Sequence, residues 1–136
     1  MTKEIAGQLT LLIMTLLLTA CDRVANIQVQ VINSFSKTIS VTFIDNNHFT
    51  DTLQTVVVKS GDTAVILKTH SGILGRYEIP HDVFLSSDTF EMFKKFQISI
   101  DSIVLKKDFR LSKEWTYIGV DKDLGVYKLK IDSTDN

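Results

Sequence analysis

The stretch Ile27-Gln28-Val29-Gln30-Val31 sets the pattern on which the fold is built. Its apolar and polar residues alternate, which places the aliphatic side chains on one face of an extended chain and the glutamines on the other. Ile39-Ser40-Val41-Thr42-Phe43 repeats this alternation after the turn-forming residues 33–37. Both stretches predict half-buried strands, and their short separation predicts that they form a hairpin.

Similar β-rich runs continue along the chain, with turn residues about every ten positions. The further strands are predicted at residues 52–59, 63–69, 73–79, 103–105, 115–120 and 126–131. Ser60-Gly61-Asp62 predicts a hairpin turn between 52–59 and 63–69, and the last two strands are predicted to form a closing hairpin. The unbroken apolar runs 56–58 and 64–67 predict strands that are covered on both faces.

Residues 86–101 fit two templates. Asp88-Thr89-Phe90-Glu91 resembles a capping box, and three phenylalanines at three-residue spacing would share a helical face. The alternative is one long strand, because most apolar residues of this segment share one parity and their neighbours are polar. Phe93 is the exception to that parity. The strand template fits more positions and is the prediction.

Together these elements predict an all-β, antiparallel, immunoglobulin-like β-sandwich of about seven to nine strands, with the resemblance to immunoglobulins limited to architecture. The domain is predicted to span residues 27–132, and the polar residues 133–136 to form a frayed tail. Trp115 is predicted to fill the core, since a tryptophan buries a large area.

Residues 9–18 form an apolar run that ends shortly before Cys21, the single cysteine of the 136-residue chain. A helix that spans a bilayer needs about 20 apolar residues, so this run is too short to do so. It has the length of the hydrophobic region of a secretory signal peptide. A chain with one cysteine cannot form an intramolecular disulfide bond.

Leu18-Thr19-Ala20-Cys21 resembles a bacterial lipobox. The resemblance implies that residues 1–20 are a signal peptide removed by cleavage between Ala20 and Cys21. It also implies that Cys21 carries a diacylglycerol on its thiol and a further acyl chain on its amino group. Residues 21–26 would then be a short lipidated tether, and the membrane would be a partner through this lipid.

The chain as a whole resembles small uncharacterised lipoproteins of the Bacteroidota, which have a lipobox, a β-rich domain and a tryptophan before the last hairpin. Ser87-Asp88-Thr89-Phe90 and Trp115 carry the resemblance here. Exported members often have an acidic cluster after the cysteine. Asp22-Arg23-Val24-Ala25 stands in its place, which favours a location in the bacterial cell envelope on a periplasm-facing leaflet.

Four sites match the Asp-Ser/Thr-aliphatic pattern of the O-glycosylation system of that phylum, and the acceptors are Thr52, Thr63, Ser102 and Ser133. The competing interpretation is that these pairs are ordinary turn residues. The histidines His48, His70 and His81 lack metal-ligand spacing, so no metal site or cofactor is predicted. No nucleophile, phosphate-binding or dinucleotide-binding motif is present, and no catalytic residue is assigned.

The formal net charge is −1, with lysine and aspartate interspersed. This balance lacks the basic stripe that nucleic-acid binding requires. The sequence therefore predicts a lipid-anchored, non-catalytic binding or structural module whose partner is an envelope protein or a glycan. Two alternatives remain: an envelope hydrolase with a site built from loops, and a β-barrel that binds a small ligand.

Overall fold

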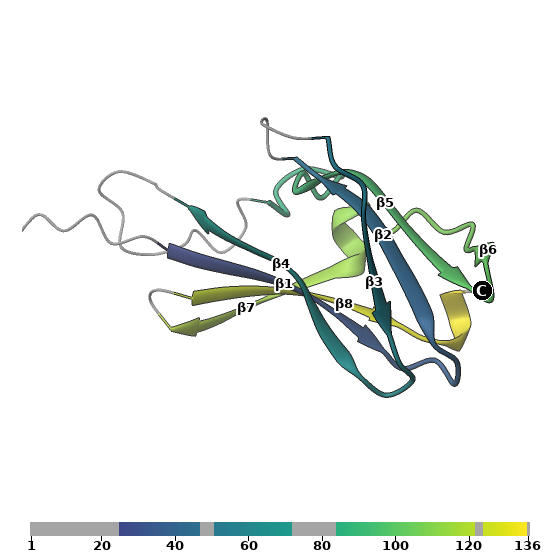
Figure 1. The fold of residues 1–136 in the computed structure, drawn as a ribbon. Coiled ribbons are helices and arrows are strands. Elements are labelled where there is room, and N and C mark those ends of the chain that lie inside the picture. Colours follow the sequence, from purple (N-terminus) through teal and green to yellow (C-terminus); the bar gives the residue numbers. More distant parts are fainter. Residues whose placement is uncertain (1–24, 47–50, 72–83, 122–123, 136) are drawn as a thin grey trace, which may run out of the picture.

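The computed structural model describes residues 25–46, 51–71, 84–121 and 124–135. Two four-stranded sheets pack against each other (Figure 1). The first sheet contains, in spatial order, β4 (Thr63–Ser71), β1 (Ala25–Asn33), β8 (Leu124–Ile131) and β7 (Trp115–Asp121). The second contains β3 (Gln54–Val58), β2 (Ile39–Asp45), β5 (Phe93–Ile100) and β6 (Ile103–Val104). The predicted sandwich is confirmed: the described residues form eight strands in two separate sheets.

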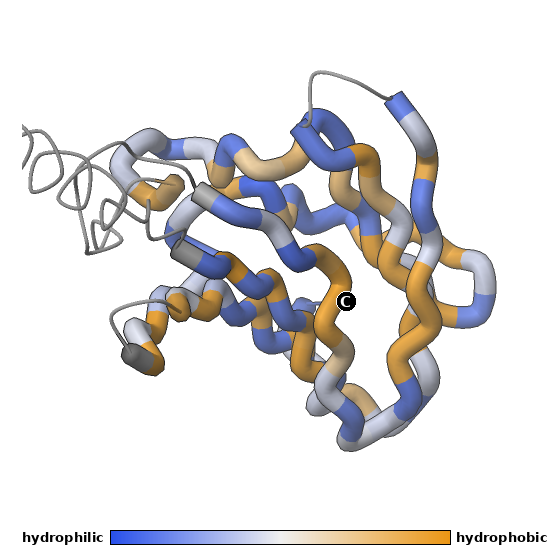
Figure 2. Tube along the Cα trace, turned by 60° about the vertical axis from the view of Figure 1, so that its left-hand side comes forward, coloured by the Kyte–Doolittle hydropathy of each residue, from blue (hydrophilic) through white to orange (hydrophobic). Residues whose placement is uncertain are grey.

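The alternating residues of β1 and β2 fill the space between the sheets. Ile27, Val29 and Val31 of β1 are at most 1% exposed, and the inward residues of β2 are fully buried. Hydrophobic and hydrophilic positions alternate along the strands of both sheets (Figure 2). Burial of one aliphatic side chain contributes about 2 kcal/mol, so this alternation is the main source of stability.

The predicted hairpin between β1 and β2 is wrong, because the two strands lie in opposite sheets. The same holds for β3 and β4. Both connections are arches at the same end of the sandwich, and the side chain of Asn33 joins them. Its Nδ2 donates to the carbonyl oxygens of Lys37 (2.8 Å) and Val58 (2.9 Å), and its Oδ1 accepts from the Phe35 N–H.

The arch between β3 and β4 depends on a glycine. Gly61 has a φ of 80°, in the left-handed region that other residues adopt at a cost. Its N–H donates to the carbonyl oxygen of Asn33, and the Asn33 N–H donates to the carbonyl oxygen of Asp62. The end of β1 is therefore bonded to the arch through both backbone and side chain.

β1 and β8 pair in parallel along their whole length, which departs from the predicted antiparallel arrangement. Every other strand pair is antiparallel in the described part of the chain, including the predicted hairpin of β7 and β8. β1 and β8 are far apart in sequence, so no short turn between them forces them to run antiparallel.

The apolar runs in β3 and β4 are not covered on both faces as predicted. Each strand lies at the edge of its sheet. Val57 is 62% exposed and Val65 is 41% exposed. The pairing of β4 with β1 shifts its register between Val29 and Gln30. Ile66 is therefore an extra residue on β4, and its side chain lies in the interior.

The strand interpretation of residues 86–101 is confirmed for its second half, and no helix forms in this segment. β5 begins at Phe93, and the preceding residues form turns and a short bridge between Thr89 and Leu111. The pairing of β5 with β2 shifts its register between Ile44 and Asp45, so Lys94 of β5 is an extra residue with no partner on β2. This bulge explains why Phe93 breaks the parity of the strand and is nevertheless buried.

Aromatic side chains fill the centre of the sandwich around Trp115, as predicted. Trp115 is 4% exposed, and its ring centroid lies 4.4 Å from that of Phe90 and 5.5 Å from that of Phe96. Its Nε1 donates to the buried carbonyl oxygen of Phe109 at 2.8 Å.

The tail differs from the frayed segment predicted for residues 133–136. Ser133–Asp135 forms a 3-10 turn, η2, and the side chain of Asp135 is 5% exposed. The carboxylate accepts from the Asp132 N–H and pairs with Lys107, which holds the turn against the domain.

Several predictions lie outside the described residues: the signal peptide 1–20, Cys21 and most of the tether, the strand at 73–79, His48 and His81. Ala25 and Asn26, the last two residues of the predicted tether, belong to β1.

Candidate ligand-binding groove

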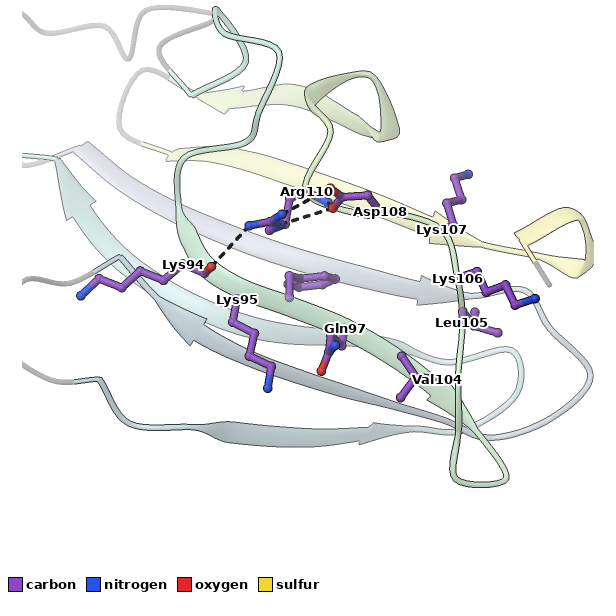
Figure 3. Close-up of a pocket in the computed structure, with 10 residues that line it drawn as sticks. Lys94, Lys95, Gln97, Val104, Leu105, Lys106, Lys107, Asp108 and Arg110 are labelled. Atoms are coloured by element: carbon purple, nitrogen blue, oxygen red, sulfur yellow. Dashed lines mark hydrogen bonds and ion pairs between the residues drawn. The ribbon is translucent and has the colours of Figure 1, made fainter.

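A groove of about 360 Å³ lies between β5 and the chain segment 104–110 (Figure 3). The turn at Asp101 and Ser102 creates it, because positive φ angles at both positions reverse the chain within two residues. The returning segment pairs with β5 at Ser99 and Ile100 and then diverges from it. At the other end Arg110 reaches back toward the carbonyl oxygen of Lys94 (3.5 Å).

Cationic side chains dominate the lining. The lining residues are Lys94, Lys95, Phe96, Gln97, Val104, Leu105, Lys106, Lys107, Asp108 and Arg110. Five of these ten residues are cationic and one is anionic, whereas the whole chain has a net charge of −1. The lysines extend from both rims, two from β5 and two from the returning segment (Figure 3).

Three of the five cations have carboxylate partners. Lys94 pairs with Asp51, and Arg110 pairs with Asp108. Lys107 contacts both Glu114 (2.6 Å) and Asp135 (2.5 Å). These ion pairs neutralise three of the five cations of the lining.

Lys107 is the most strongly held of these cations. Hydrogen bonds to Asp135 and then to Glu114 raise the pKa of the Lys107 ammonium, so it stays charged. η1 (Ser112–Glu114) supplies one of these carboxylates and η2 the other. The C-terminal turn therefore helps to hold Lys107, a residue of the groove lining, in place.

Asp108, the one carboxylate of the lining, also stays charged. The backbone N–H of Arg110, and then its side chain, donate to this carboxylate and lower its pKa. Both oxygens of Asp108 accept hydrogen bonds from Arg110. The carboxylate is thus occupied within the protein and neutralises only one of the cations.

Lys95 and Lys106 differ from the other cations, because neither has an ion-pair partner among the described residues. Both are exposed. They lie on opposite rims of the groove, one on β5 and the other on the returning segment. These two ammonium groups are the ones available to an incoming anion.

The backbone of β5 adds hydrogen-bonding groups to the same groove. The carbonyl oxygen of Ile98 points to the returning segment, where it accepts from the Leu105 N–H, and that of Lys94 points to Arg110. Alternate residues of a strand present their backbone groups to the same edge. The N–H and C=O of Phe96 therefore face the groove between these two contacts.

A second groove, of about 440 Å³, lies at another end of the sandwich and is lined by residues of mixed charge, including Asp45, Glu91 and Lys68. His70 also lines it, and its Nδ1 lies 2.8 Å from Oδ1 of Asn26. Within the described residues no group of three or more histidine, cysteine, aspartate and glutamate side chains is placed to hold a metal ion.

The four predicted glycosylation acceptors are all exposed but lie apart. Thr52 precedes β3, Thr63 begins β4, Ser102 is in the turn that leads to β6, and Ser133 begins η2. Ala20 and Cys21, the predicted cleavage and lipidation residues, are outside the described part of the chain.

The sequence interpretation missed the basic groove because the lysines are interspersed with acidic residues along the chain. The available signal was the pair of dipeptides Lys94-Lys95 and Lys106-Lys107 on either side of one hairpin turn. A hairpin brings its two arms side by side, so the two dipeptides meet at one edge of the sheet.

No helix in the described part of the chain has the length and apolarity needed to cross a bilayer. Comparisons with models of protein families, with curated proteins and with solved structures found no match. The function is therefore inferred from the groove and from the N-terminal motif.

Proposed function

We propose that the protein is a lipid-anchored component of the bacterial cell envelope that binds an anionic glycan in the groove between β5 and residues 104–110. The lipobox-like residues 18–21 support attachment through Cys21, and residues 22–25, which lack an acidic cluster, support a periplasm-facing leaflet. The observation that carries the binding proposal is the cationic lining, with Lys95 and Lys106 unpaired within the described chain.

The lining suits a ligand that is held through its charged groups and not through stacking of its rings. Neutral sugars and nucleic-acid bases are usually held by stacking on exposed aromatic rings. Phe96 is the one aromatic residue of the groove, and it is 5% exposed. Ammonium groups and backbone N–H groups suit carboxylate, phosphate or sulfate substituents. An acidic glycan is thus favoured over a nucleic acid.

We propose binding without catalysis. Glycoside hydrolysis uses two carboxyl groups on either side of the scissile bond. The groove holds one carboxylate, Asp108, whose oxygens accept hydrogen bonds from Arg110. Its lowered pKa makes it a poor proton donor near neutral pH.

The proposal is tested by titrating the full-length lipidated protein, held in a neutral detergent, with an oligogalacturonate and with its methyl ester. We expect the acid to bind about tenfold more tightly than the ester, because two exposed charge contacts of about 0.7 kcal/mol each correspond to that factor. Binding of the acid should weaken as salt concentration rises, since salt screens exposed charges.

The variant K95Q/K106Q should lose about tenfold in affinity for the acidic oligosaccharide. The control K59Q/K130Q changes the net charge equally at two exposed lysines outside the groove, and its affinity should stay within about twofold of the parent. Equal losses in both variants would contradict the groove as the site. Tighter binding of a single-stranded oligonucleotide than of the acidic oligosaccharide would overturn the glycan assignment.

The exposed acceptors Thr52, Thr63, Ser102 and Ser133 support O-glycosylation as a further proposal. Intact mass of the native protein tests it. Glycosylation predicts a mass above that of peptide and lipid, and a mass equal to peptide and lipid would contradict it.

A further inference from the structure

The outer face of the sheet that contains β2 consists mainly of hydroxyl and amide side chains. The inward residues of β2 are fully buried, so Ser40 and Thr42, which alternate with them, point outward. Their partners in the strand register share this face and are Thr55 and Val57 of β3 and Gln97 and Ser99 of β5. The outward positions of these three strands include no carboxylate.

Three of these side chains form a row across the sheet, and we call Thr55, Thr42 and Gln97 the polar row. Thr42 pairs with Thr55 on one side and with Gln97 on the other. The Oγ1 atoms of the two threonines lie 3.2 Å apart. Neighbouring strands are about 4.8 Å apart, so the row is about 10 Å long. Hydroxyl and amide groups both donate and accept hydrogen bonds, which suits the hydroxyl groups of a sugar.

The polar row begins at the strand that lines the groove. Lys95 and Gln97 are two residues apart on β5 and extend from it in the same direction (Figure 3). Phe96, between them, points inward and is 5% exposed, and Leu105 across the groove is 8% exposed. Because these two buried side chains close the inner side of the groove, the groove opens toward the outer face. A ligand in contact with Lys95 can therefore continue onto the polar row.

The positive charge of this face is confined to the side of the groove. Lys95 is the one cation at the outward positions of β3, β2 and β5. The outer face of the other sheet differs, since Lys68, Lys128 and Lys130 occupy outward positions on two of its strands. A ligand that crosses the first face meets cations in the groove and uncharged polar groups beyond it. This distribution suits a glycan in which an acidic sugar is followed by neutral sugars.

We propose that the groove binds the acidic sugar of a mixed glycan and that the polar row binds neutral sugars attached to it. This inference rests on the proposed glycan binding in the groove and names the class of glycan. No outward position of β3, β2 or β5 has an aromatic ring, so the neutral sugars would be held by hydrogen bonds and not by stacking. Such contacts are open to water and add modest affinity to that of the acid.

The experiment measures the binding of two oligosaccharides to the full-length lipidated protein in a neutral detergent. One has a glucuronate attached to a single xylose residue, and the other has the same glucuronate attached to xylotetraose. The single acidic group fixes the position of both compounds in the groove. We expect the longer compound to bind about tenfold more tightly, because its neutral sugars reach the polar row and form about two further hydrogen bonds.

The variant T42V/T55V removes the two hydroxyl groups of the polar row. Valine keeps the branched shape and is favourable in strands, and neither hydroxyl group is left without its partner because both are removed together. We expect the variant to lose most of the tenfold gain and to bind the shorter compound within about twofold of the parent. T63V/T116V is the matched control, because both threonines are exposed at outward positions of the other sheet.

Equal affinities of the parent for the two compounds would overturn the inference and leave binding of the acid in the groove intact. Parent-like binding of the longer compound by T42V/T55V would also overturn it, as would equal losses in T63V/T116V. A protein that binds oligogalacturonate but neither of these compounds would contradict the mixed glycan alone. Failure to bind any of the three would instead contradict the proposed function.

Discussion

Replacing Trp115 with alanine is expected to lower the free energy of unfolding by about 4 kcal/mol. The substitution leaves a cavity among Phe90, Phe93 and Phe96, whose rings surround the indole. It also leaves the buried carbonyl oxygen of Phe109 without its donor. Urea unfolding followed by circular dichroism measures the change.

The variant W115F separates the two contributions. Phenylalanine retains most of the ring packing but cannot donate to Phe109, so the expected loss is about 1–2 kcal/mol. If W115F lost as much stability as W115A, the hydrogen bond would dominate. If W115A lost less than about 1 kcal/mol, the central position of Trp115 would be contradicted.

Replacing Asn33 with alanine is expected to cost about 3 kcal/mol, an unusually large effect for a polar residue at the end of a strand. Asn33 is fully buried, and its side chain satisfies the carbonyl oxygens of Val58 and Lys37 and the N–H of Phe35. Val58 is itself 1% exposed, so water cannot replace the lost donor without disturbing the packing.

Asn46 supplies the matched control. Its Nδ2 also donates to a backbone carbonyl oxygen, that of Glu91, but this contact is exposed. N46A should therefore cost less than about 1 kcal/mol in the same urea titration. Equal losses in N33A and N46A would show that Asn33 does not join the two arches in the way its hydrogen bonds indicate.

The two arches differ from the predicted hairpins in the partner of each strand, while the strands themselves lie where they were predicted. The alternation in β1 and β2 is a local property, and it identified both strands and their buried faces correctly. The choice of partner is not local. A short link such as residues 34–38 can close a hairpin within one sheet or cross the space between two sheets, which is about 10 Å.

The contacts that decide between the two connections come from distant parts of the chain. Asn33 bonds to Val58, twenty-five residues away, and the Ser34 N–H donates to the carbonyl oxygen of Ile131. The groove also depends on contacts between distant parts of the chain. Its two lysine dipeptides are visible in the sequence. The carboxylates that pair with Lys107 come from η1 and η2, and no periodic pattern in the sequence predicts these two turns.

The buried tail follows from long-range pairing as well. Polar composition alone favours a frayed terminus, and the sequence shows no apolar residue that would hold residues 133–135 in place. A carboxylate that is 5% exposed, bonded to the Asp132 N–H and paired with Lys107, provides the attachment instead.

The most direct test of the proposed lipid anchor is to compare the intact mass and membrane partitioning of the native protein with those of C21S. Two or more acyl chains hold a protein firmly to a bilayer, whereas one chain gives marginal binding. We expect the native protein to begin at Cys21, to carry lipid and to remain with the membranes, and C21S to retain residues 1–20 and to carry no lipid. A C21S variant that is cleaved normally and partitions with membranes like the native protein would contradict the account.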